Sequence, residues 1–201
     1  MDKGLQTRER ILAAAEPLVL EKGFAGTSLD DILRATGLTK GAFFHHFRGK
    51  GDLARALVER YAHNDYALFE RFAAEADAAT DDPLEAALEF LKGFERFIEA
   101  QADPLPGCVF AGYTYESLQF EPSIHAFITD SLRRWQALYE TRFSAVLARY
   151  TPARPVTAEG LAEMMVALIE GGFVLSRSYR DAHLLARQSA QFRQYLELLF
   201  A

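Results

Sequence analysis

The chain has 201 residues, of which 50% are apolar and 25% are charged, and its formal net charge at pH 7 is −6. This composition is typical of a soluble globular protein and excludes a disordered or fibrous chain, while the length allows one or two domains. Alanine and leucine number 32 and 26, whereas valine and isoleucine number only 7 and 6. Because strong helix formers outnumber β-branched residues so clearly, we predict an all-α fold.

The charge is distributed unevenly along the chain. Residues 1–50 contain eight Lys or Arg and six Asp or Glu, a net charge of +2, so residues 51–201 carry −8. Such an asymmetry favours a small anion-binding module followed by a larger acidic body, although chance scatter would also produce it. The overall negative charge argues against a general nucleic-acid binder.

Cysteine content and hydropathy bear on the compartment. The single cysteine, Cys108, excludes an intrachain disulfide framework and fits a reducing environment, and we expect a small buried thiol there. The apolar stretch 11–20 is interrupted by Glu16, so it does not resemble a secretory signal. The longest apolar segment, 164–175, contains Glu170 and is shorter than the roughly 20 residues of a membrane span. We expect a cytoplasmic protein with no membrane partner.

The first predicted helix covers residues 7–21, where apolar residues recur at helical spacing. Gly23 is expected to end it. Pro17 lies inside this helix and lacks a backbone donor, so we expect a kink or a local break near Ala13.

Two short helices follow and are joined by a tight turn. Ser28, with Asp31 three residues later, is typical of a capping box that opens a helix, and Gly37 is expected to end that helix after about two turns. Thr39 supplies a second N-cap, which predicts a helix over residues 40–46. Two short helices joined by a glycine turn indicate a helix-turn-helix.

The remainder of the chain reads as six further helices, for a total of about nine, with no convincing strand. A long helix begins near Gly49, and Pro83 is placed at the first position of the next. After a short segment over 108–118, helices are predicted from Pro122, over 158–176 and over 182–200. The helix over 158–176 carries apolar stripes on two sides, so we expect both of these sides to be buried.

The segment Thr39–Asp52, TKGAFFHHFRGKGD, and the preceding GFAGTSLDDILRATGL resemble the DNA-binding domain of the TetR family of bacterial transcriptional regulators. The segments PGCVFAG and LIEGGFVL are similar to pieces of the ligand-binding domain of many members. The resemblance implies a DNA-binding domain over residues 1–50 and an effector-binding and dimerisation domain over 51–201. It also implies a repressor that a small molecule releases from double-stranded operator DNA.

The physical chemistry of the second short helix agrees with DNA binding. Thr39 and Lys40 begin it, where backbone donors and the helix dipole favour phosphate or base acceptors. Gly41 and Ala42 lack bulk, so the backbone can approach the major groove. Phe43 and Phe47 are expected to face the core, whereas Phe44 stands where most members have tyrosine and would lose its phosphate hydrogen bond. With His46 as a phosphate contact by family analogy, the predicted DNA-binding residues are Thr27, Ser28, Thr39, Lys40, Gly41, Ala42, Phe44, His45, His46 and Lys50.

Two further sets of residues concern the second domain. In the family this domain encloses an effector pocket, and its many Tyr and Trp residues suit a small, mostly apolar effector with a few polar handles. We predict Phe110, Tyr113, Trp135 and Met165 as pocket residues. The doubly apolar helix and the terminal helix need more cover than one subunit offers, which predicts a homodimer through Leu168, Gly172, Leu175, Phe192, Leu196 and Leu199.

Other classes of function remain open at this point. A phosphate-cradling loop around Gly49 and Lys50 fails, because that motif requires glycine in place of Phe44 and serine or threonine in place of Gly51. No hydrolase or zinc-protease motif is found, and we expect no catalytic residue, no metal and no cofactor. The alternatives are a DNA-binding regulator that needs no ligand, or a helical small-molecule-binding protein or enzyme whose helix-turn-helix is structural.

Overall fold

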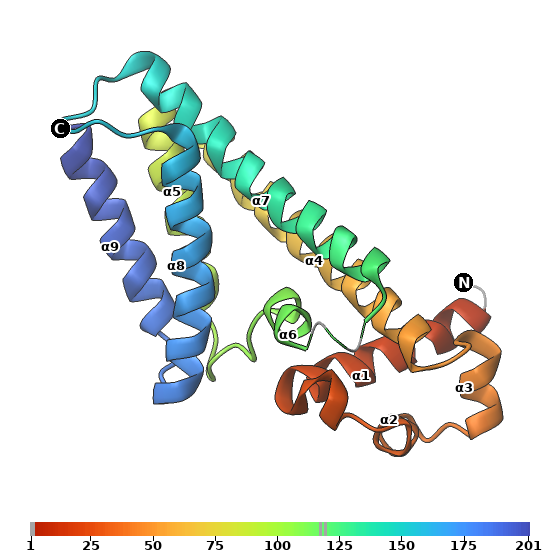
Figure 1. Cartoon of the computed structure of the whole chain (residues 1–201). Helices are drawn as coiled ribbons and strands as arrows, with labels where there is room; N and C mark the ends of the chain where they lie inside the picture. Colours follow the sequence, from red (N-terminus) through yellow and green to blue (C-terminus); the bar gives the residue numbers. More distant parts are fainter. Residues whose placement is uncertain (1–2, 117, 119) are drawn as a thin grey trace. The chain divides into compact units, whose positions relative to one another are not determined.

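The computed structural model describes residues 3–116, 118 and 120–201. Those residues form nine α-helices and no strand, which confirms the prediction of an all-α fold (Figure 1). In chain order they are α1 (Lys3–Gly26), α2 (Leu29–Thr36), α3 (Lys40–His46), α4 (Lys50–Ala79), α5 (Pro83–Glu99), α6 (Val109–Tyr115), α7 (Pro122–Arg149), α8 (Ala158–Tyr179) and α9 (Leu184–Leu199).

The helices form two compact units. Unit 1 consists of residues 1–64 and 108–129, and unit 2 consists of residues 65–107 and 130–201. Helices α1, α2, α3 and α6 belong to unit 1, helices α5, α8 and α9 belong to unit 2, and α4 and α7 contribute residues to both. The functional boundary near residue 50 stays a prediction, because packing alone does not say which residues bind DNA.

Unit 1 has a core that fixes the helix-turn-helix on α1. Ile11 and Leu12 of α1 and Phe43 and Phe47 of α3 are almost completely buried. The burial of the two phenylalanines confirms their predicted inward orientation. At the end of α2, the Arg10 guanidinium donates to the carbonyl of Thr36 at 2.8 Å.

The local break expected near Ala13 is wrong, because the backbone remains helical through Pro17, while the kink given as its alternative stays a prediction. The missing donor of Pro17 leaves one carbonyl without its helical partner, but the buried side chains on both sides of the proline, Ala15 and Val19, hold the helix in place. The non-helical backbone in α1 lies instead at Gly23, which has φ 76° and ψ 166°. A positive φ of this size favours glycine. The helix predicted to end at Gly23 is interrupted there, but α1 continues to Gly26.

Unit 2 is held together by aromatic packing and by one partly buried ion pair. The Phe69 ring on α4 packs against Phe94 on α5 and Trp135 on α7, with ring centroids 5.7 Å apart in each case. Helices α5, α8 and α9 lie side by side (Figure 1). Between α5 and α9, the Arg193 guanidinium donates to the Glu95 carboxylate at 3.2 Å.

Within the described ranges, every helix is too short or too polar to span a lipid bilayer.

Candidate nucleic-acid interface

The turn between α2 and α3 is built from local capping interactions. The Ser28 hydroxyl accepts a hydrogen bond from the Asp31 amide at 3.1 Å, and the Ser28 amide donates to the Asp31 carboxylate at 3.1 Å. These bonds confirm the predicted capping box, and the hydrogen bond from the Ser28 hydroxyl is the main cause that lowers the pKa of Asp31. Gly37 ends α2 with φ 66°, and the Thr39 hydroxyl accepts from the Ala42 amide at 3.2 Å at the start of α3.

Helix α3 presents a polar, sterically open face. Thr39, Lys40 and Gly41 are exposed at its first turn, and Ala42 is half-buried behind them. A Cβ atom at Gly41 would meet only the Thr39 hydroxyl, at 4.0 Å, so the backbone here is open to close approach. Because the first turn of a helix carries unpaired amide donors, this face suits phosphate or base acceptors.

The later part of α3 adds aromatic and imidazole groups to the same surface. Phe44 is 45% exposed, and its ring meets the buried Phe43 ring edge-on at 5.5 Å. His45 is exposed and His46 is half-buried, with their rings 5.1 Å apart. Both imidazoles therefore remain available as hydrogen-bond donors near the end of α3.

Thr27 does not lie on this surface. Its side chain is 0% exposed, and its hydroxyl donates to the Gly23 carbonyl at 2.8 Å. The neighbouring Ser28 is exposed at the N-terminus of α2. Of the two residues expected to contact phosphate from α2, only Ser28 presents its side chain to solvent.

Lys50 is engaged within unit 1. Its ammonium lies 3.4 Å from the Ala25 carbonyl, to which it donates, and 4.5 Å from the centre of the Phe24 ring. Burial lowers the pKa of Lys50, and the Glu116 carboxylate opposes that shift. Lys50 thus connects the first turn of α4 to the segment between α1 and α2.

The partner of that segment is a residue that sequence reasoning missed. Glu116, at the C-terminus of α6, accepts hydrogen bonds from the amides of Phe24 at 2.9 Å and Ala25 at 2.7 Å. A Cβ at Gly23 would clash with a carboxylate oxygen of Glu116 in the position that accepts these two hydrogen bonds. Nothing local in the sequence signals this contact, because it joins residues more than 90 positions apart.

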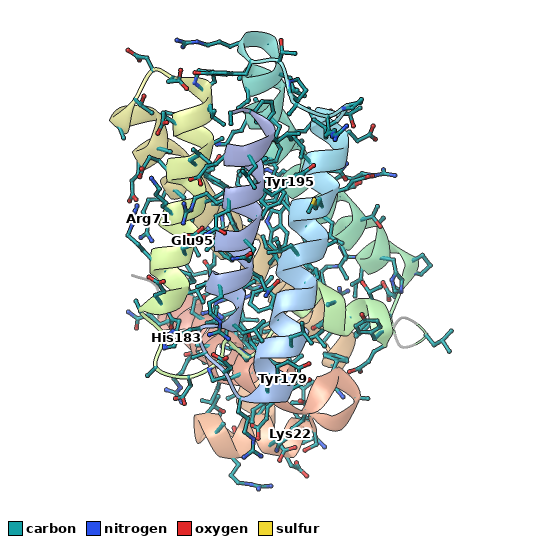
Figure 2. The ribbon with its side chains drawn as sticks, turned by 90° about the vertical axis from the view of Figure 1, so that its left-hand side faces the viewer. Lys22, Arg71, Glu95, Tyr179, His183 and Tyr195 are labelled. Carbon is teal, nitrogen blue, oxygen red and sulfur yellow. The ribbon has the colours of Figure 1, made fainter. Side chains whose placement is uncertain are left out.

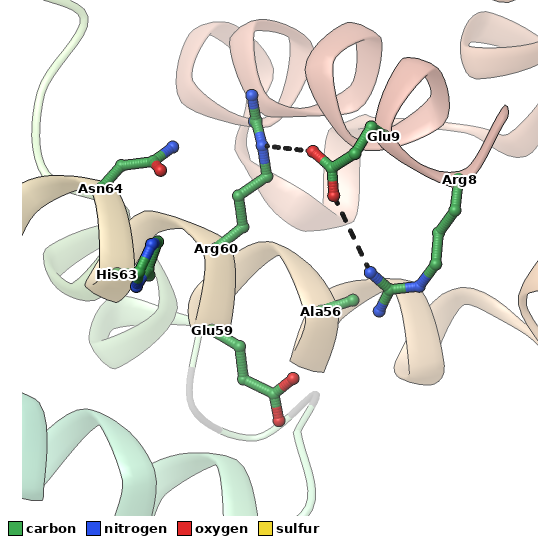
Figure 3. A pocket seen from close by; sticks show the side chains of 7 residues that line it. All are labelled: Arg8, Glu9, Ala56, Glu59, Arg60, His63 and Asn64. Atoms are coloured by element: carbon green, nitrogen blue, oxygen red, sulfur yellow. Dashed lines mark ion pairs between the residues drawn. The ribbon is translucent and has the colours of Figure 1, made fainter. Parts of the chain in front are cut away.

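A polar hollow of about 460 Å³ lies between α1 and α4 in the same unit (Figure 3). Arg60 pairs there with Glu9 at 3.3 Å, and it also pairs with Glu16. Arg8 lies 4.0 Å from the second oxygen of Glu9. The hollow is therefore lined by groups that already neutralise one another while they hold α1 against α4.

The four predicted effector residues are all buried, and they are divided between the units. In unit 1, Phe110 packs edge-on against Tyr61 at 5.2 Å, and the Tyr113 hydroxyl donates to the Ala54 carbonyl at 3.3 Å. Trp135 and Met165 lie in the core of unit 2. Cys108 is buried as expected.

Unit 2 also contains buried polar atoms that the sequence did not single out. The Tyr139 hydroxyl and one carboxylate oxygen of Asp65 are buried without a hydrogen-bond partner in the described part of the chain. Burial, and next the neighbouring Glu170 carboxylate, raise the pKa of Asp65 to about 7. This combination is unusual in a core, where buried polar groups are normally satisfied.

The predicted dimer residues fall into two groups. Phe192, Leu196 and Leu199 are buried inside the subunit, and Gly172 packs so closely that a Cβ there would lie 2.3 Å from a methyl group of Leu185. Leu168 is half-buried, and Leu175 is exposed. Other apolar side chains of α8 and α9 do reach the surface, and Figure 2 shows Tyr179 and Tyr195 among them; the set is Met164, Val174, Leu175, Tyr179, Tyr195 and Leu198.

Comparisons with known proteins agree with this geometry. Residues 11–57 match the model of the tetR family of bacterial regulatory proteins, and residues 83–191 match the C-terminal domain of LmrA/YxaF-like transcriptional regulators. The transcriptional regulator LmrA of Bacillus subtilis is 30% identical over 179 residues, which are 88% of this chain and 89% of that protein. The repressor NemR of Escherichia coli is 42% identical over 55 residues, 27% of this chain and 28% of NemR.

Solved structures extend the likeness to the whole chain. A TetR transcriptional regulator from Chloroflexus aurantiacus has a TM-score of 0.81 and 29% identity, and the match covers 99% of this chain and 98% of that one. A TetR-family regulator from Agrobacterium tumefaciens, at 24% identity and a TM-score of 0.80, shares the fold over 99% of this chain and 100% of its own. The chain belongs to the TetR family and is a helix-turn-helix transcriptional regulator.

Proposed function

We propose that this chain is a repressor that binds double-stranded operator DNA as a homodimer in the cytoplasm and leaves the DNA when a small-molecule effector binds. The observation that carries the proposal is the exposed first turn of α3, where Thr39, Lys40 and Gly41 present donors and little bulk. A helix with this face fits the major groove, in which base edges display their hydrogen-bonding pattern.

We assign base contacts and phosphate contacts to different residues. We assign Thr39, Lys40 and Ala42 to base edges, because they stand at the N-terminal turn of the proposed recognition helix. Ser28, His46 and Lys50 are assigned to phosphate. For Lys50 this contact requires its ammonium to exchange the Ala25 carbonyl for a phosphate oxygen.

Phe44 and His45 complete the proposed DNA surface. Phe44 has no hydroxyl, so its exposed ring contributes packing against a sugar rather than a hydrogen bond. His45 is exposed beside it and supplies a donor. Thr27 contributes indirectly, because its hydroxyl donates a hydrogen bond to the Gly23 carbonyl and so fixes the end of α1.

The proposed dimer uses the exposed apolar side chains of α8 and α9. Val174, Leu175 and Tyr179 reach the surface from α8, and Tyr195 and Leu198 reach it from α9. An apolar surface on two neighbouring helices favours a twofold contact with a second copy, since both subunits then bury the same patch. The buried Phe192, Leu196 and Leu199 position these helices from the inside.

The effector is proposed to bind in the second domain, among the apolar side chains of unit 2 that include Trp135 and Met165. Phe110 and Tyr113 are buried separately in unit 1. Support comes from the concentration of buried aromatic rings in unit 2. Such a compound releases DNA only if it binds the DNA-free form more tightly than the DNA-bound form.

A selection from random DNA followed by a gel-shift titration tests the proposal. We expect one enriched palindromic sequence, and we expect Lys40→Ala to alter its base preference at a defined position by about 1 to 3 kcal/mol. Lys92→Ala, which removes a lysine from α5, serves as the control and leaves preference unchanged. Failure to enrich any sequence would contradict the proposed function.

A further inference from the structure

Three helices bring unusual polar groups together within unit 2. Asp65 comes from α4, Tyr139 from α7 and Glu170 from α8. The three groups are close enough that the two carboxylates act electrostatically on each other and on the Tyr139 hydroxyl. Two neighbouring carboxylates disfavour each other's charged form, and burial adds to this cost at Asp65.

The hydrogen bonding of this cluster is incomplete. Tyr139 is only 1% exposed, and its hydroxyl has no partner among the described residues. One carboxylate oxygen of Asp65 is also buried without a partner. Buried polar atoms in native proteins are nearly always paired, so these two atoms are available to a hydrogen-bonding molecule that binds here.

Aromatic rings border the same cluster. Asp65 and Phe69 lie one turn apart on α4, as Trp135 and Tyr139 do on α7. The Phe69 ring lies 5.7 Å from the Trp135 ring and 5.9 Å from the Tyr139 ring. The faces of aromatic rings attract cations, most strongly when the site is shielded from water.

The cluster does not fit a metal ion. The described residues hold no group of three His, Cys, Asp or Glu side chains arranged to bind one. A neutral donor could complete the hydrogen bonds, but it would leave the repulsion between the carboxylates in place. An organic cation with N–H groups removes both costs at once.

We propose that Asp65, Tyr139 and Glu170 anchor an effector that is a small protonated amine, with Phe69 and Trp135 packing around its apolar part. This inference rests on the proposed function, since it narrows the effector of that repressor to one chemical class. The charged group would lie between Asp65 and Glu170, and the Tyr139 hydroxyl would order it. The effector, which the sequence predicts to be mostly apolar, is thus proposed to carry one positive charge.

Three matched probes and calorimetry on the DNA-free full chain test this assignment. Phenethylamine has the charge and the N–H donors, phenethyltrimethylammonium has the charge alone, and 2-phenylethanol has neither the charge nor the ammonium donors. We expect affinity to fall in that order. Binding of the alcohol as tightly as the amine, or binding of none of the three, would overturn the proposal.

Variants of the cluster locate the site. Asp65→Asn should weaken phenethylamine binding by at least about 30-fold, because a buried charged hydrogen bond is lost. Tyr139→Phe keeps the ring packing and should weaken it by about 5-fold. Asp130→Asn, an exposed acid of α7, is the matched control and should bind like the wild type. Equal affinity of Asp65→Asn and Asp130→Asn would contradict the assignment.

A DNA titration on the same protein separates the two proposals. If the wild type selects an operator but shows no preference for the amine, the effector class is wrong and the proposed repressor stands. If the amine binds through Asp65 while no operator can be selected, the site is supported and the proposed function fails.

Discussion

Replacement of Asp65 by asparagine should make unfolding stability less sensitive to pH, in a direction set by the buried carboxyl. Burial, and next the Glu170 carboxylate, raise its pKa from 3.8 to about 7 in the folded chain. Between these two values the folded state holds a proton that the unfolded state has released. Stability contributed by this group is therefore present at low pH and is lost as the pH rises toward 7.

The size of the effect follows from the shift. Each pKa unit corresponds to 1.36 kcal/mol, so a rise from 3.8 to about 7 amounts to a loss of about 4 kcal/mol in the free energy of unfolding above pH 7. Asparagine resembles the protonated acid in shape and carries no charge. The Asp65→Asn chain should thus match the wild type near pH 4 and exceed its stability by about 4 kcal/mol near pH 8.

Urea unfolding followed by circular dichroism at pH values from 4 to 8 measures this difference. The quantity of interest is the variant's free energy of unfolding minus that of the wild type, because other titrating groups cancel. The charged group that acts on Asp65 is the Glu170 carboxylate, which is present in both the wild type and the variant. A difference that stays constant with pH, or one that the exposed Asp130→Asn control reproduces, would refute the reasoning.

Three other substitutions test separate parts of the structure. Gly23→Ala should destabilise the chain by about 1 to 3 kcal/mol, seen as a lower melting temperature, because of its positive φ and the 2.4 Å approach to Glu116; an unchanged melting temperature would contradict this. Lys50→Ala should weaken binding to all DNA sequences alike and reduce the salt slope by about 1, whereas an unchanged slope would rule out a phosphate contact. Leu198→Asp should give monomers in sedimentation, since Leu198 is 75% exposed on α9. The control Leu5→Asp, at a leucine of α1 that is 61% exposed, should remain dimeric.

Much of the fold could be predicted because its signals are local. Ser28 and Thr39 each accept a backbone hydrogen bond at the helix N-terminus where the sequence predicted a cap. Gly37 ends α2 in the left-handed conformation that glycine favours. The same local patterns located the exposed face of α3, which is the centre of the candidate site.

The misses depend on contacts between distant segments. Pro17 was expected to break α1, but whether a helix survives a missing donor depends on the packing around it, which sequence does not display. Glu116 approaches Gly23 only through the tertiary fold. Likewise, Asp65 and Glu170 look like two ordinary surface acids until α4 and α8 are brought together. A buried acid carries no sequence signature of its own.

The acid cluster also bears on how an effector can act on DNA. Moving a regulator from 1:99 to 99:1 between two forms requires about 5.5 kcal/mol of differential affinity. A cation bound beside Asp65 favours the charged form of this acid and so opposes the shift that burial and Glu170 cause. Only the part of this interaction which differs between the DNA-free and DNA-bound forms acts on the operator, because a ligand with equal affinity for both forms shifts nothing. By linkage, saturating operator must weaken the binding of the amine by the same factor as saturating amine weakens operator binding, so the two titrations measure one coupling energy from opposite sides.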